Sequence, residues 1–222
     1  MTRKVVLPGE LLSKEDKKIG TGVVKNDEGL FSTHLGLLDE KNNYLRVIPS
    51  AGGYNPKEDD FVIGVVSDTQ NTYWRLDIAS PYSAILPGRE YFRELRGGER
   101  LKDLTPVGST VYVKIKEVTK NKGVFVSMKW RGTKVLNEGL LIEVSPSKIP
   151  RIIGKSDSML STLNNESECD VIAGQNGVVW ISGPIERVNL VIEAIRYIEK
   201  NTHVGGLTDY IKKMIIEKRN KL

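Results

Sequence analysis

The residues best placed to do chemistry in this chain are cations. Between positions 89 and 134 the sequence holds twelve lysines and arginines against five acidic residues. Positive charge at this density is expected of a surface that meets a polyanion, although a solvated lysine-rich face has the same composition. The cations are Arg89, Arg93, Arg96, Arg100, Lys102, Lys114, Lys116, Lys120, Lys122, Lys129, Arg131 and Lys134.

Aromatic side chains interleave with these cations. Tyr73, Trp74 and Arg75 open an apolar run, and alternation along a strand would send one ring inward and leave the other exposed. Lys129 and Arg131 flank a tryptophan. Rings that stack on bases, beside lysines that attract phosphates, are typical of proteins that bind single-stranded nucleic acid. We therefore predict RNA contacts at Tyr73, Trp74, Arg75, Lys114, Lys116, Lys120, Lys122, Lys129 and Arg131.

A second candidate RNA site lies around Gly154. The segment Gly154-Lys155-Ser156 stands between two short apolar runs that indicate helices, where a glycine lets backbone N–H groups approach a phosphate. A G-x-x-G turn of this kind would have its second glycine at Asp157. An acidic side chain there repels phosphate, so direct RNA contact and a purely structural turn both stay open. The candidates are Arg151, Gly154, Lys155 and Ser156.

Other chemistry finds little support in the sequence. One cysteine, Cys169, and two histidines, His34 and His203, are too few for a structural zinc site. No carboxylate cluster stands beside a histidine or in a known catalytic motif. We therefore predict no enzyme activity, no metal and no cofactor. No apolar run approaches the roughly 20 residues that span a bilayer, and we expect a cytoplasmic protein.

Two β-rich segments come first in the chain. Residues 1–57 hold short apolar runs broken by glycine, proline and asparagine, which predict a small N-terminal β domain. Residues 58–135 hold five short β runs, and in 111–116 apolar and lysine-bearing positions alternate. The return at 124–129 predicts a hairpin around 120–123. Five short strands with one apolar face favour a closed barrel of the OB type.

The last segment, residues 136–222, changes to a mixed pattern. Its order of strand, helix, helix, strand, strand and helix is that of a type I KH domain, a module that binds RNA. A helix is predicted over 188–198, and a final helix beginning at Thr208. Gly174, Gln175, Asn176 and Gly177 form a glycine-rich turn that locally indicates a hairpin connection. The fold class is thus mainly β with an α+β C-terminal module.

The module order resembles the RNA-binding cap subunit of the archaeal exosome, the class that pairs an S-one-type barrel with a KH domain. The similarity covers essentially the whole chain. Its strongest marks are Pro150-Arg151-Ile152-Ile153-Gly154-Lys155, Gly174-Gln175-Asn176-Gly177 with Trp180, and His203-Val204-Gly205-Gly206-Leu207-Thr208-Asp209. In that family the G-x-N-G turn is a signature of the KH module.

The resemblance implies a trimeric cap on a hexameric phosphorolytic ring. The N-terminal domain would grip the ring, copies of a sister cap subunit could share the cap, and RNA 3′ ends would be guided into the pore with a preference for A-rich substrates. Barrels of this type often present an aromatic where Arg75 stands and a histidine near Leu86, so phosphate attraction by lysines becomes the main hypothesis. The alternatives are a free-standing single-stranded RNA-binding regulator of translation or RNA stability, an RNA-processing enzyme and a structural adaptor.

Overall fold

The computed structural model describes residues 4–41, 43–49, 52–94, 99–202 and 204–220, so that Arg96, His203 and residues 50–51 lie outside it. The chain divides into two compact units, Met1–Gly52 and Gly53–Leu222. Tyr54 already belongs to the second unit, because its ring is buried in the barrel core and its hydroxyl donates to Asp60 at 2.6 Å.

The first unit is a small β domain, as predicted. Its core contains Val6, Leu30, Leu45 and Val47, and the alternation within 44–49 explains which side of the sheet is buried. One sheet has the order β1 (Lys4–Val6), β6 (Gly36–Lys41), β7 (Tyr44–Pro49) and β3 (Lys18–Ile19). The other has the order β2 (Leu11–Ser13), β5 (Gly29–Ser32) and β4 (Val23–Asn26).

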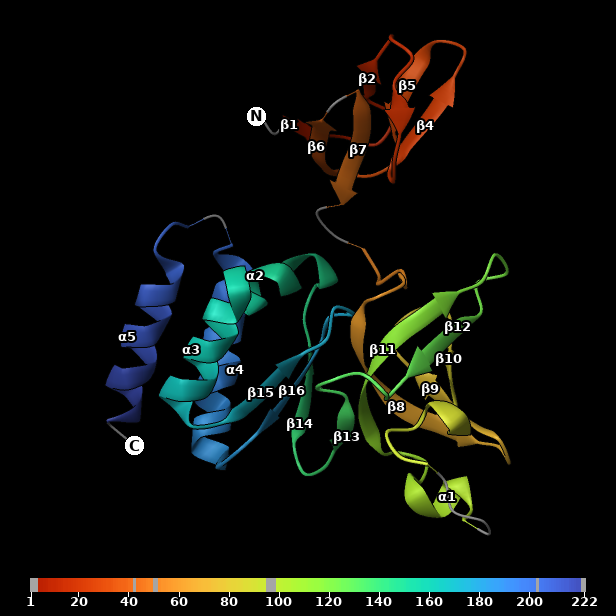
Figure 1. Cartoon of the computed structure of the whole chain (residues 1–222). Helices are drawn as coiled ribbons and strands as arrows, with labels where there is room; N and C mark the ends of the chain where they lie inside the picture. The colour runs from red at the N-terminus through yellow and green to blue at the C-terminus, as the bar shows by residue number, and fades with distance from the viewer. Residues whose placement is uncertain (1–3, 42, 50–51, 95–98, 203, 221–222) are drawn as a thin grey trace. The chain divides into compact units, whose positions relative to one another are not determined.

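The second unit begins with the predicted five-stranded barrel (Figure 1). Its strands are β8 (Phe61–Thr69), β9 (Tyr73–Asp77), β10 (Ala84–Pro87), β11 (Thr110–Val118) and β12 (Val124–Ser127). The barrel closes because β12 pairs with β10 in parallel and with β11 in antiparallel fashion. Val111, Val113 and Ile115 are fully buried, which confirms the alternation read from the sequence. A short helix, α1 (Leu101–Leu104), precedes β11, and β13 (Lys134–Leu136) extends the sheet beside it.

The rest of the unit is a type I KH domain, also as predicted. Its elements are β14 (Leu140–Glu143), α2 (Ile149–Ile153), α3 (Ser158–Ser167), β15 (Asp170–Ala173), β16 (Val178–Ser182), α4 (Ile185–Lys200) and α5 (Leu207–Arg219). The sheet has the order β14-β16-β15 with antiparallel pairs. Helix α5 begins at Leu207 rather than Thr208, because Gly206 takes a left-handed conformation before it. Among the described residues no helix is long and apolar enough to cross a membrane.

Strand β16 joins the two modules. Its Val179 and Ile181 belong to the KH core under the helices, whereas Val178 and Trp180 pack against Ile63 of the barrel. Figure 1 shows the helices on one side of the KH sheet and the barrel on the other. A strand covered on both faces requires a continuous apolar run, and this explains why β16 does not alternate.

The turn 174–177 fixes the barrel and the KH module together by hydrogen bonds. Asn176, 2% exposed, donates from Nδ2 to the carbonyl oxygens of Ile63 at 2.8 Å and Ile78 at 2.9 Å, and its Oδ1 accepts from the Ile63 amide. Gln175 exchanges hydrogen bonds with both main-chain groups of Phe61. A Cβ at Gly174 would lie 2.8 Å from the Ile63 nitrogen, so the close approach requires glycine.

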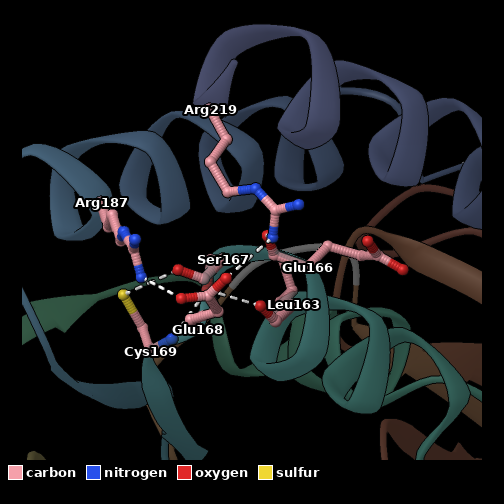
Figure 2. A network of polar contacts seen from close by, with 7 residues as sticks. All are labelled: Leu163, Glu166, Ser167, Glu168, Cys169, Arg187 and Arg219. Carbon is pink, nitrogen blue, oxygen red and sulfur yellow. Dashed lines mark hydrogen bonds and ion pairs between the residues drawn. The ribbon is translucent and has the colours of Figure 1, made fainter. Parts of the chain in front are cut away.

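Ion pairs at the end of α3 fasten the last helix to the KH module (Figure 2). Glu168 follows α3 with a left-handed backbone, and its carboxylate lies between Arg187 of α4 and Arg219 of α5. Arg219 also donates to the main-chain oxygen of Glu166 at 2.9 Å. The C-terminal part of α5 is therefore tied to the loop that leads into β15.

We expect Asn176→Ala to weaken the junction between the barrel and the KH module. The substitution leaves the Ile63 amide and two carbonyl oxygens without their partner, and unsatisfied buried groups cost about 1–3 kcal/mol each. The unfolding free energy should fall by about 3 kcal/mol in urea titration, and amide exchange at β8 should accelerate. Asn121→Ala, at an exposed position in the β11–β12 hairpin, is the control. Equal stability of the two variants would contradict this account.

Candidate nucleic-acid interface

The outer surface of the barrel is divided between two roles. The side formed by β8, β11 and β13 is packed against the KH sheet through Ile63, Leu136 and their neighbours. On the opposite strands, the register aligns Arg75 of β9 with Ile85 of β10 and Phe125 of β12. Arg75 is exposed, and Ile85 and Phe125 are half-buried. This row offers an apolar and aromatic strip with a guanidinium at its edge, and we call it the outer strip.

Of the two predicted aromatics at the start of β9, one belongs to the core. Trp74 is fully buried, and its Nε1 donates to the carbonyl oxygens of Leu101 at 3.2 Å and Thr105 at 3.0 Å. Its ring also packs 5.0 Å from that of Tyr91. The prediction of an RNA contact at Trp74 is therefore corrected, because the ring presents no face to solvent. Tyr73, half-buried, shares the outward side of the strand with Arg75.

The predicted cations fall into two groups according to their partners. Lys114 pairs with Asp59 at 2.8 Å and Lys116 with Glu90 at 2.7 Å. By contrast, several exposed cations hold no carboxylate within ion-pair distance among the described residues. A cation without a partner keeps its full attraction for phosphate, whereas a paired one must first give up a carboxylate. These unpaired cations are Arg75, Arg89, Lys102, Lys120, Lys122, Lys129, Arg131 and Lys134.

Lys114 departs most from the prediction. The alternation of β11 places it on the outer side as expected, yet the residue is only 9% exposed. Its Nζ lies 3.6 Å from the ring centroid of Trp130, in addition to the ion pair with Asp59. Both partners come from loops that fold over the strand, so the strand pattern could not reveal them. Lys114 is not available as a free phosphate ligand.

Lys116 is exposed but partly neutralised. Burial would raise the pKa of the Glu90 carboxyl, but hydrogen bonds from Lys116 and Ser127 outweigh it and hold that pKa below its ordinary value. Glu90 is therefore ionised at neutral pH and competes with RNA for Lys116. We therefore expect most of the phosphate attraction to come from cations without such a partner.

The β11–β12 hairpin presents two unpaired lysines on a defined turn. The carbonyl oxygen of Thr119 accepts from the amide of Lys122 at 2.9 Å, and its hydroxyl accepts from the amide of Gly123 at 2.9 Å. Lys122 has a left-handed backbone, with φ of 63°. Lys120 and Lys122 are both exposed. Their charges lie in the turn just before β12, the strand that carries Phe125 of the outer strip.

The KH loop has the backbone of a clamp but not its full chemistry. Gly154 has φ of 78°, and a Cβ there would lie 2.7 Å from the amide nitrogen of Met159. Ser156 and Asp157 are also left-handed, so Asp157 adopts the conformation that a second glycine would take more easily. Lys155, Ser156 and Asp157 are exposed. RNA contact by Gly154, Lys155 and Ser156 remains a prediction.

Two other predicted groups are engaged in internal contacts. The Arg151 guanidinium donates to the carbonyl oxygen of Val204 at 2.7 Å, which ties α2 to the connection between α4 and α5. Gln175 and Asn176 bind the barrel backbone, so the glycine-rich turn is a hairpin connection, as its local pattern indicated. Among the described residues no three His, Cys, Asp or Glu side chains gather as a metal site would require.

Sequence reasoning did not name Phe125 as an RNA contact, and it gave Trp130 only as the ring between two predicted cations. Phe125 completes the outer strip, and its place follows from the alternation of β12 once the barrel is closed. Trp130 stands between two predicted cations, so its neighbours in sequence were the available signal. Both rings are accessible at least in part, unlike that of Trp74.

Comparisons with known proteins agree on one family. Residues 3–50 match the family described as the N-terminal domain of the exosome RNA-binding protein RRP4, and residues 139–187 match the KH domain. The chain is 38% identical over 214 residues to the exosome complex component Rrp4 of Methanothermus fervidus, which covers 96% of each chain. It is 38% identical over 226 residues to that of Pyrococcus furiosus, covering 99% of this chain and 85% of the relative.

One solved structure matches both the sequence and the fold. A crystal structure described provisionally as an exosome complex RNA-binding protein is 30% identical, with a TM-score of 0.67. The match covers 77% of this chain and 99% of that chain.

We expect Lys120→Glu with Lys122→Glu to lower the affinity for single-stranded RNA and its dependence on salt. Each phosphate that the protein no longer neutralises reduces the slope of log K against log salt concentration by about 0.7 for single strands, so the slope should fall by at least about 1.4. Fluorescence anisotropy of a labelled oligoadenylate measures both quantities. Lys212→Glu with Lys213→Glu in α5 makes the same change in net charge and is the control. An unchanged affinity and slope in the hairpin variant would sink the prediction.

Proposed function

We propose that this chain, which belongs to the Rrp4 family of exosome components, is a non-catalytic subunit that binds single-stranded RNA for the archaeal exosome. In finer detail, we propose a trimeric cap, shared in part with a sister subunit, on a hexameric phosphorolytic ring in the cytoplasm. RNA 3′ ends would pass from the cap into the pore, A-rich ends preferentially. The observation that carries the proposal is a barrel on which several exposed cations, Lys120 and Lys122 among them, have no carboxylate partner among the described residues, in a chain of this family.

The barrel supports the RNA-binding part of the proposal. The outer strip supplies partly exposed rings for stacking, and Lys120 and Lys122 supply phosphate attraction next to it. Nothing in this arrangement of described residues reads base edges through a dedicated pocket. It suits a subunit that holds many different RNA 3′ ends as they move toward a nuclease.

The KH module supports a mainly positional role. The side chains of Gln175 and Asn176 in its signature turn are hydrogen-bonded to the barrel, and Arg151 is hydrogen-bonded within the module. Of its candidate RNA-binding groups, those in the loop 155–157 are exposed, and there the positive charge of Lys155 is offset by the negative charge of Asp157. We propose that the module fixes the orientation of the barrel and adds only weak RNA contacts.

The N-terminal unit supports assembly with a protein partner. Strand β1 lies at the edge of its sheet, with Val5 61% and Leu7 60% exposed. Ile19 and Val24 of the same unit are each 48% exposed. Val5 and Leu7, two positions apart at an unpaired sheet edge, are the exposed apolar pair best placed for a protein contact. We propose that β1 and its surroundings dock on the ring, a surface that a free-standing RNA-binding regulator, the alternative, would not need.

We expect Val5→Asp with Leu7→Asp to abolish docking on the ring without changing RNA affinity. Burying two carboxylates without partners at the contact has a desolvation cost that the remaining apolar contacts do not offset. The measurement is light scattering after gel filtration of the chain mixed with purified ring subunits, and the mass of the complex also gives the number of chains per ring. Val107→Asp, at a barrel position 62% exposed, is the matched control. If the wild-type chain binds RNA but never joins the ring, the free-standing regulator takes first place.

A further inference from the structure

Trp130 is the exposed tryptophan of the chain. Its relative exposure is 50%, whereas Trp74 and Trp180 are 0% and 6% exposed. The residue follows β12, on a turn whose main chain is held by Thr133. The Thr133 hydroxyl donates to the carbonyl oxygen of Trp130 at 2.7 Å, and its amide donates to the same atom at 3.2 Å. A large apolar ring is thus kept in water on a fixed backbone.

The ring itself is also held in place, from one side. Lys114 Nζ lies 3.6 Å from the centroid of the Trp130 ring. The same ammonium is anchored by Asp59 at 2.8 Å and lies 5.5 Å from the Phe61 ring. One face of the indole therefore has a charged partner that is nearly buried. An aromatic ring oriented in advance loses little conformational freedom when a ligand stacks on it.

The chain on both sides of Trp130 is cationic. Lys129 and Arg131 are exposed and hold no carboxylate within ion-pair distance among the described residues. Lys129 also acts on Glu90, whose pKa its charge helps to lower. A ring between two exposed cations combines a stacking face with phosphate attraction, the pair of features that sequence-tolerant sites for single strands use. A protein partner would instead be expected to meet depleted charge around the ring.

Trp130 is linked to the junction between the barrel and the KH module through Lys114 and Phe61. Lys114 Nζ lies near the Phe61 ring, and the centroid of that ring lies 5.7 Å from the centroid of the Tyr112 ring, with the two rings stacked. Burial raises the pKa of Tyr112 to about 12, and the negative charge of Asp157 in the KH loop contributes to that rise, which places the loop within electrostatic reach of the barrel. The contacts run from Trp130 through Lys114 to Phe61, whose main-chain amide is bound by Gln175 of the KH turn.

We propose that Trp130 is a base-stacking residue for single-stranded RNA at the junction of the barrel and the KH module. The inference rests on the proposed RNA-binding function and adds a second contact, separate from the outer strip. A base lies on the open part of the Trp130 ring, and the adjoining phosphates approach Lys129 and Arg131. Lys114 is a positioning residue that holds the ring, and does not itself contact phosphate.

The experiment compares variants of the full chain in binding to a labelled single-stranded oligoadenylate. Trp130→Ala and Trp130→Leu should weaken binding about 5- to 160-fold, the range found for loss of one stacked base. The salt slope should stay unchanged, because no phosphate ligand is removed. Trp130→Phe should recover most of the affinity. RNA should quench the tryptophan emission of the wild type, and this quenching should disappear in Trp130→Phe, since Trp74 and Trp180 are buried.

The controls separate this inference from the function on which it rests. Tyr210→Ala removes an aromatic ring of matched exposure, 49%, from α5 and should leave the affinity unchanged. Lys114→Met keeps the buried stem and should shift the Trp130 emission with a smaller loss of affinity. If the Trp130 variants bind normally while charge reversal at Lys120 and Lys122 weakens binding, the stacking role is overturned and the RNA-binding function stands. If the wild type does not bind RNA, the function itself fails.

If Trp130 served a protein contact instead, a different pattern would appear. The Trp130 variants would then keep their RNA affinity and lose comigration with the ring subunits in gel filtration. That outcome would overturn the stacking role and transfer Trp130 to the assembly surface. Trp130→Leu guards against a trivial loss of fold, because leucine still covers the stem of Lys114.

Discussion

The contact of the turn 174–177 with strand β8 is the constraint on which the rest of the second unit depends. One amide side chain, Asn176, replaces the hydrogen bonds that Ile63 and Ile78 would otherwise make with water, in a position that is almost fully buried. Such a network tolerates only one arrangement of its partners, because each group left over would be unsatisfied. The barrel and the KH module therefore behave as one body. The packing of Val178 and Trp180 of β16 against Ile63 accompanies that arrangement.

Periodicity was sufficient to predict the framework of this protein. Alternation predicted the inward face of β11, the spacing of apolar residues predicted α4, and the glycine-rich turn was correctly interpreted as a hairpin connection. These features are local, so each segment carries its own information. The turn's second role could not be predicted in this way, since the Ile63 amide that it binds lies 113 positions away.

The candidate interface was harder to predict, because its charges depend on partners from distant loops. Lys114 and Lys120 look alike in the sequence, yet one is covered by Asp59 and Trp130, whereas the other has no carboxylate partner among the described residues. Trp74, a predicted RNA contact, closes the barrel core, whereas Trp130 stands in water. Composition gives the total of positive charge, whereas only the fold shows which cations can still meet phosphate. We therefore expect the contribution of a cation to RNA binding to depend on whether a carboxylate already pairs with it.

The long separation between β8 and the turn also orders events during synthesis. β8 leaves the ribosome well before residues 174–177 are synthesised. All five barrel strands therefore exist before the KH sheet that covers one side of the barrel. In that interval Ile63 and Leu136 face water as an apolar surface, the kind of transient surface at which nascent chains aggregate or recruit chaperones. Completion of the KH hairpin ends the exposure. A translational pause between β13 and β16 would therefore be a hazard for this chain, and rapid, uninterrupted elongation through its last third protects the barrel.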